Sequence, residues 1–268
     1  MFYFIFSPNN SGTTVMAQYA AQQSGAFLPP VPSAEGQLLP AVREMMRNRP
    51  WDTESPFDWA YIRAQWEDAM HKAGKSDFVE GSPPNMIRVA RILDTFPERR
   101  AVLSIANPFS QIASCIKNYN TVINVDVLRN TTLTWVEKAT IQRRNMERWP
   151  DIPRITYEAF CHEPAVLNRA LGFPVTDVEP VAGKGNSRIP FIVDMTVKNI
   201  CFLTVFEVLA ITETLSAHQD LLDAFGYRLI DRAAYDDMMR AEPGLAAAGL
   251  VDRSAWHVSP RAARVAPV

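Results

Sequence analysis

Short apolar runs alternate with amphipathic stretches along most of this chain. Phe2–Phe6 is an apolar run that ends at Ser7-Pro8, and Phe78–Glu80, Ala101–Ile105 and Arg154–Thr156 have the pattern of further short strands. Between them, apolar residues recur at helical spacing. The helices predicted from this spacing are Thr13–Gln23, Asn85–Thr95, Pro108–Lys117, Val127–Arg148 and Ala159–Leu171, the last closed by Gly172.

This order of elements predicts the fold class. Strands that alternate with helices form α/β structures in which a parallel central sheet carries helices on both faces. For a chain of 268 residues we expect one domain over residues 1–252. Within it, the Pro-rich segment 25–60 is expected to be irregular and to act as a lid or acceptor loop. Residues 253–268 are expected to form a mobile tail.

Composition narrows the function classes. Lys plus Arg is 27 against 29 Asp plus Glu, a balance that argues against a nucleic-acid partner. The three cysteines are scattered and the four histidines isolated, so neither a disulfide framework nor a metal site is predicted. The first apolar run lacks a basic region before it, and no later stretch is long and uncharged enough to span a bilayer. We therefore expect a cytoplasmic protein with no transmembrane segment.

The strongest chemical signal follows the first strand, where Ser11-Gly12-Thr13-Thr14 opens a helix. Backbone N–H groups at a helix start bind anions, glycine permits close approach, and the hydroxyls can donate further bonds. A side chain at Gly12 is expected to block a phosphate while leaving the fold intact. The spacing of a Walker A loop is absent. The alternative interpretation is an ordinary capped helix.

Five stretches together resemble sulfotransferases that use 3′-phosphoadenosine 5′-phosphosulfate (PAPS). The SGTT loop resembles the family's 5′-phosphosulfate loop, and four later segments fit its motifs in the same order. They are FVEGSPPNMIRVARILDTFPERRAVLSI, IANPFSQIASCIKNY, RITYEAFCHEPAVLNRALGFP, and AGKGNSRI with ITETLSAHQDLLDAFGYRL. The resemblance spans residues 1–230 and implies a P-loop-like sulfotransferase fold with PAPS as the donor.

The resemblance also implies roles for individual residues. Those expected to bind the donor are Ser11, Gly12, Thr13, Thr14, Ser114, Lys184 and Arg188. The chain departs from the family at three positions that are usually basic, now Asn10, Gly81 and Ala106. Contacts to charged groups contribute roughly 1.5–3 kcal/mol each, so these losses weaken donor binding unless other residues replace them. Asn10 can still donate a hydrogen bond to the bridging oxygen.

Glu80 is the candidate general base, since it ends a strand at the sheet edge where α/β folds bind ligands. The alternative is that Glu80 supports the following turn. His71 is a weaker candidate base, more typical of a surface residue. The aromatic residues near the insertion could line an acceptor pocket or pack beneath a loop; they are Trp51, Phe57, Trp59, Tyr61 and Trp66. A solvated helix face is the expected role of Arg143, Arg144 and Arg148, although one could replace a missing cation.

Three functions remain. The first is sulfuryl transfer from PAPS to a hydroxyl or amine of a small molecule or lipid. The second is a sulfotransferase-like binding or scaffold protein without catalysis, favoured by the three lost cations. The third, a small-molecule kinase, is disfavoured by the missing Walker lysine. The sequence does not determine the acceptor or the oligomeric state.

Overall fold

A computed structural model of the whole chain describes residues 1–119, 123–174 and 192–258. The chain divides into two compact units. One comprises Met1–Ile105 with Arg144–Val193, and the other comprises Ala106–Arg143 with Asp194–Val268. Each unit draws on two separate stretches of sequence, so no single position along the chain separates them.

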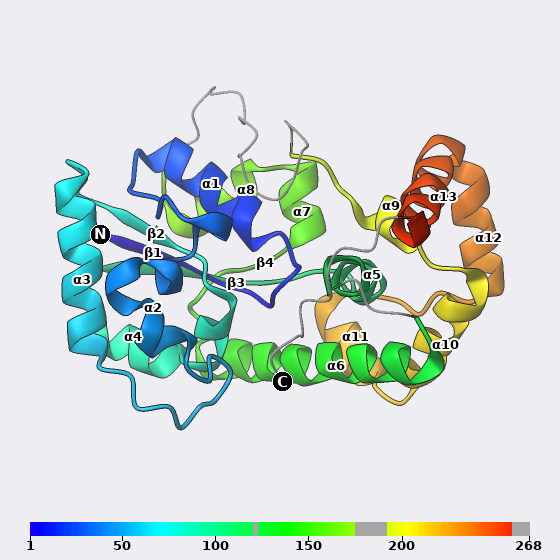
Figure 1. Cartoon of the computed structure of the whole chain (residues 1–268), viewed down its shortest axis with the longest axis horizontal. Coiled ribbons are helices and arrows are strands. Elements are labelled where there is room, and N and C mark those ends of the chain that lie inside the picture. The colour runs from blue at the N-terminus through cyan, green and yellow to red at the C-terminus, as the bar shows by residue number, and fades with distance from the viewer. Residues whose placement is uncertain (120–122, 175–191, 259–268) are drawn as a thin grey trace. The chain divides into compact units, whose positions relative to one another are not determined.

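Four parallel strands form the sheet among the described residues of the first unit (Figure 1). Their spatial order is β2-β1-β3-β4. The strands are β1 (Phe2–Phe6), β2 (Phe78–Glu80), β3 (Arg99–Ile105) and β4 (Arg154–Thr156). In the register, Phe4 of β1 pairs with Glu80 on one side and Ala101 on the other. The predicted α/β class with a parallel sheet is confirmed, and β3 begins slightly earlier than its apolar run.

One face of the sheet carries a layer of stacked aromatic rings. Phe2 and Phe4 of β1 lie 4.6 and 5.1 Å from Phe96, measured between ring centroids. Trp66 of helix α3 (Trp59–Lys72) stacks on Phe78 and Phe96, at 5.3 and 5.6 Å. Trp66 is thus a core residue, and the five aromatic residues near the insertion do not act as one group.

The opposite face carries α1, α7 and α8. Ile5, Val79 and Val102 from three neighbouring strands share one buried cluster with Met16 of α1 and Phe160 of α7. Figure 1 shows α1 and α8 on the same side of the strands, and the two helices are in contact. The bounds are Thr13–Ser24 for α1, Tyr157–His162 for α7 and Ala165–Leu171 for α8. Burial on both faces explains why the strands have continuous apolar runs.

The helix predicted over 159–171 is two helices. α7 ends at His162 and α8 begins at Ala165, because Pro164 has no N–H to donate. A proline also disfavours helical geometry in the residue before it, and Glu163 has a φ of −140°. Gly172 closes α8 in the left-handed conformation, as predicted.

The helix predicted over 85–95 is also divided. A 3₁₀ turn covers Pro83–Ile87, and α4 covers only Val89–Thr95. Arg88 stands between them with a φ of −121°. Its guanidinium donates to the carbonyls of Pro50, Pro84 and Asp52, so this break positions a side chain that holds the insertion.

The insertion 25–60 has more regular structure than its sequence predicts. Two 3₁₀ turns cover Pro32–Ala34 and Gly36–Leu38, and helix α2 covers Pro40–Arg47. Proline suits the first position of a helix, where its missing N–H is not needed. Val42 and Met46 bury one face of α2. Two apolar residues one turn apart are too short a pattern to reveal a helix in advance.

The second unit consists of helices in its described part. Among described residues of the whole chain, no helix combines the length and apolar character needed to cross a lipid bilayer. The helices are α5 (Pro108–Tyr119), α6 (Val125–Arg148, with residues to Arg143 in this unit), α9 (Thr196–Ile200), α10 (Val205–Ser216), α11 (Gln219–Phe225), α12 (Arg232–Ala241) and α13 (Pro243–Val258).

Residues 253–258, which the sequence assigns to a mobile tail, are helical in the structure, because α13 continues to Val258. Arg253 forms a bidentate ion pair with Glu207 of α10, with two N–O distances of 2.9 Å. It also donates to the carbonyl oxygen of Phe202. These interactions fix a residue that local sequence places in a polar tail. Residues 259–268 lie outside the described part of the chain.

Candidate functional site

The loop between β1 and α1 lies at the carboxyl edge of the sheet, where the chain connections diverge. β1 leads along the chain to β2 on one side, whereas its other neighbour, β3, leads to β4 on the far side. β1 and β3 end close together, since Phe6 pairs with Leu103. Ligands of open α/β sheets bind at such a switch point. The SGTT loop therefore occupies a position typical of ligand-binding loops.

The hydroxyls of Ser11 and Thr13 are directed into the loop itself. The Oγ atoms of Ser7 and Ser11 lie 2.7 Å apart, and Ser11 Oγ also donates to the carbonyl oxygen of Pro8. Thr13 Oγ1 donates to the same carbonyl at 3.3 Å. A hydroxyl has one proton to donate. In this structure the hydroxyl protons of Ser11 and Thr13 are used to shape the loop. The sequence had instead led us to expect that these hydroxyls donate to a bound anion.

Two residues of the loop have a left-handed backbone conformation. Asn10 has a φ of 59° and Gly12 a φ of 77°, and Gly12 is the N-cap residue of α1. Glycine offers no side chain to cap the first N–H groups of a helix, which have no acceptor within the helix. The backbone at the start of α1 is thus the part of this loop best suited to bind an anion. Asn10 and Thr14 are both partly exposed beside it.

Gly12 is required for a reason that sequence reasoning missed. A Cβ atom at this position would lie 2.1 Å from Cδ2 and 2.2 Å from Cε2 of Tyr157. Tyr157 begins α7, directly after β4, and its ring covers the Cα of Gly12. A side chain at Gly12 must therefore displace the Tyr157 ring, so a substitution here is also expected to lower the stability of the fold. The one hint of this contact in the sequence is the Tyr157-Glu158 pair, which directly follows the predicted strand Arg154–Thr156.

Glu80 ends β2 as a buried carboxylate with three hydrogen-bond donors. Its oxygens accept from Gly36 N at 2.7 Å, Ser82 N at 2.8 Å and Asn85 Nδ2 at 2.9 Å. The side chain is 1% exposed, and burial raises its pKa to about 7 despite the hydrogen bonds from Ser82 and Gly36. This geometry fits the turn-supporting interpretation of Glu80 better than that of a base that meets a substrate.

The carboxylate also attaches the insertion to the sheet. Gly36 donates its N–H to Glu80, and the carbonyl oxygen of Gly36 accepts from Trp66 Nε1 at 3.3 Å. The next residue, Gln37, donates its N–H to Ser82 Oγ at 3.2 Å. Gly36 has no space for a side chain, because a Cβ would lie 2.3 Å from a Glu80 oxygen. The insertion is therefore fixed at Gly36 and Gln37 to the carboxyl end of β2.

Gly81 occupies a position where the resembling family carries lysine. A Cβ at Gly81 would lie 3.1 Å from Cγ2 of Thr13 and 3.5 Å from Cβ of Ala17. The residue is buried against the start of α1. A side chain here would require Thr13 to shift slightly, so glycine allows the turn after β2 to pack closely on the loop.

The remaining predicted site residues are distributed elsewhere. Ser114 is partly exposed on α5 of the second unit. In the same unit, the Asn107 carboxamide oxygen accepts from the N–H groups of Phe109 and Ser110 and caps α5. Lys184 and Arg188 lie outside the described residues. The structure thus brings Asn10, Ser11, Gly12, Thr13 and Thr14 together in one loop, with the Glu80-Gly81 corner packed against it.

Other sequence candidates have roles away from this loop. His71 is exposed near the end of α3, as expected of a surface residue. Trp51 and Tyr61 are also exposed, whereas Phe57 lies under the Arg88 guanidinium at 4.3 Å from the ring centroid. Arg143 pairs with Asp220 at 2.7 Å. Within the described residues, none of these contacts connects to the SGTT loop.

Comparison with known proteins adds no relative. A search against models of known protein families finds no match for this chain, and a search of curated proteins finds none. Among the described residues, no three His, Cys, Asp or Glu side chains gather where they could hold a metal ion. The proposed function consequently depends on the sequence motifs and on the geometry of the loop.

Proposed function

We propose that this chain is a PAPS-dependent sulfotransferase that transfers a sulfuryl group to a hydroxyl or amine of a small molecule or lipid. The observation that carries the proposal is the position of the SGTT loop. It follows the central strand β1 at the switch point of a parallel sheet, and a left-handed glycine opens the following helix. The family resemblance supplies the identity of the donor.

In this reaction the acceptor oxygen or nitrogen attacks sulfur, and the bond from sulfur to the bridging oxygen of the 5′-phosphate breaks. The products are the sulfated acceptor, a proton and adenosine 3′,5′-bisphosphate. By analogy with phosphoryl transfer, catalysis needs alignment and stabilisation of the leaving phosphate. The backbone at Gly12–Thr14 and the carboxamide of Asn10 would provide hydrogen bonds. Lys184, Arg188 and Ser114 would bind the 3′-phosphate, as the resemblance implies.

A specific observation favours the second candidate, a binding or scaffold protein without catalysis. Glu80 is buried with three donors on its two oxygens, and Gly81 packs against Thr13 where the family has lysine. Glu80, the expected proton acceptor, is thus occupied by hydrogen bonds within the protein. Gly81 supplies no cation near the leaving group. If this candidate is correct, the protein does not turn over PAPS.

Calorimetric titration with adenosine 3′,5′-bisphosphate tests the proposal, with ATP–Mg²⁺ titrated in parallel. Micromolar binding of the bisphosphate alone supports a sulfotransferase donor site, and turnover of PAPS with a panel of phenols, alcohols and amines then separates catalysis from binding. Tight binding of ATP–Mg²⁺ alone would favour the kinase. Lys184→Ala should abolish bisphosphate binding, whereas Lys75→Ala, at an exposed lysine after α3, should leave it unchanged. Absence of bisphosphate binding by the wild-type protein overturns the proposal.

A further inference from the structure

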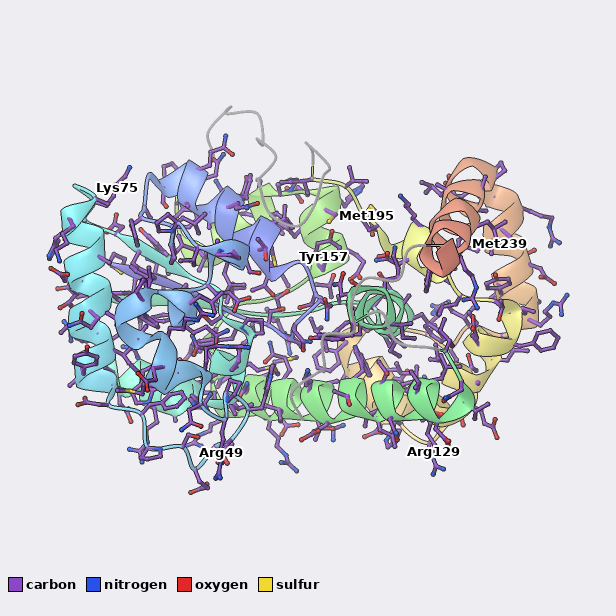
Figure 2. The ribbon with its side chains drawn as sticks, in the orientation of Figure 1. Arg49, Lys75, Arg129, Tyr157, Met195 and Met239 are labelled. Carbon is purple, nitrogen blue, oxygen red and sulfur yellow. The ribbon has the colours of Figure 1, made fainter. Side chains whose placement is uncertain are left out.

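Tyr157 joins two parts of the first unit that are far apart in sequence. Its ring lies against Gly12 of the SGTT loop, so closely that the glycine has no room for a Cβ. Its hydroxyl donates to the carbonyl oxygen of Val193 at 3.1 Å. Figure 2 labels Tyr157 at the start of α7. One side chain therefore contacts the candidate anion loop and the chain segment that follows residue 191.

The position of Tyr157 is fixed by the sheet. It directly follows β4, whose Thr156 pairs with Ile105 of β3 and caps α7 by accepting from Ala159 N. Tyr157 and Ile192 both pack against the buried cluster that contains Ile5 and Met16. The ring is thus part of a rigid core on one side and meets the loop on the other.

The loop contains two left-handed residues, Asn10 and Gly12, separated by one residue. Asparagine and glycine are the residues that adopt this conformation most readily, so the sequence permits the loop shape and the contacts around it hold that shape. The hydroxyls of Ser11 and Thr13 fix the loop from within through Pro8. Tyr157 is the neighbour that meets Gly12 from outside the loop, so the ring prevents Gly12 from moving toward α7.

We propose that Tyr157 is a positioning residue of the anion site: its ring fixes Gly12, and its hydroxyl fixes the ring by its bond to Val193. The identity of the anion rests on the proposed function, but the mechanical role of Tyr157 does not. The loop binds its ligand with little loss of conformational freedom because it is already held in shape.

Two variants separate the parts of this role. Tyr157→Phe keeps the ring and removes the hydroxyl that bonds to Val193, whereas Tyr157→Ala removes the ring as well. Tyr3→Phe is the matched control, because Tyr3 packs on the same core cluster but contacts Phe173 from the amino-terminal part of β1. The affinity for adenosine 3′,5′-bisphosphate is measured by calorimetry. Hydrogen exchange is followed in peptides covering residues 7–16, with peptides from β3 as the reference for global unfolding.

Tyr157→Phe should weaken bisphosphate binding about five-fold, the effect of one ordinary hydrogen bond, and Tyr157→Ala about thirty-fold or more. Exchange in the loop peptides should rise in Tyr157→Ala without a matching rise in β3, and Tyr3→Phe should change neither quantity. Bisphosphate binding equal to wild type in both Tyr157 variants would overturn the inference alone. If wild-type protein binds no bisphosphate, the proposed function fails, and unchanged loop exchange in Tyr157→Ala would then overturn this inference separately.

Discussion

Gly12 and Gly25 provide a comparison at the scale of single residues. Both have left-handed backbone, at the two ends of α1, with φ values of 77° and 70°. A Cβ at Gly12 meets the Tyr157 ring, whereas a Cβ at Gly25 has no heavy atom within 4 Å. A residue with a side chain would therefore have a strained backbone at both positions, but it would meet steric overlap only at Gly12.

Substitution by alanine should separate these two costs. Gly25→Ala is expected to lower the free energy of unfolding by about 1 kcal/mol, the cost of left-handed backbone in a residue with a side chain. Gly12→Ala should cost about 1–3 kcal/mol more, because the ring of Tyr157 must move. Urea denaturation of both variants measures the difference. Equal losses in the two variants would contradict the contact with Tyr157.

Glu80 shows how burial changes the chemistry of one side chain. Burial raises the pKa of this carboxyl from 4.5 to about 7, so the folded protein holds its proton more tightly than the unfolded chain does. Ionisation of Glu80 therefore costs stability. Its contribution becomes more favourable as the pH falls from about 7 toward 4.5, in contrast to carboxylates that form ion pairs.

The pH dependence of unfolding should reveal this group. Between about pH 8 and pH 5, the stability difference between wild type and Glu80→Gln should change by roughly 3 kcal/mol, with wild type gaining at the acidic end. Urea denaturation across this range measures the difference. The Gln variant should be less stable throughout the acidic range, since its amide NH₂ must face one of the donors from Gly36, Ser82 or Asn85. Parallel pH curves for the two proteins would exclude a raised pKa at Glu80.

At the scale of elements, α10 and α13 are linked through one carboxylate. Glu207 accepts from Thr204 N at 2.6 Å within a capping box at the start of α10. Its two carboxylate oxygens also accept hydrogen bonds from the two terminal nitrogens of Arg253 in α13. Thr204 and Glu207 form a capping pattern that is readable from sequence. The partner from α13 is distant along the chain, so the local sequence around Arg253 does not show this contact.

Replacing Arg253 by methionine tests the link between these helices. Arg253→Met keeps an apolar stem but leaves Glu207 without its cation, and the side chains are only 20% and 13% exposed. We expect a loss of about 2 kcal/mol in the free energy of unfolding. Arg240→Met is the control, because its pair with Asp237 is 71% and 73% exposed and should contribute less than about 1 kcal/mol. Thermal unfolding that is equally affected in both variants would contradict the role of Arg253.

At the scale of the whole molecule, the two units differ in their secondary structure. The described part of the first contains the parallel sheet with helices on both faces, and the described part of the second is helical. Each is assembled from an early and a late stretch of chain. Local sequence patterns predict strands and helices within each stretch but do not show which stretches belong together, because that depends on contacts distant in sequence.

The sequence alone determined the order of the strands along the chain, the parallel α/β class and the loop that follows Phe6. These features depend on periodicity over a few residues and on the local preferences of glycine and proline. Only the tertiary structure placed Tyr157 against Gly12, Glu80 against Gly36, and Arg253 against Glu207. Each of these partners is distant in sequence, and its position follows from the packing of elements. The loop after Phe6 was thus visible in the sequence, whereas the groups that hold it in shape were not.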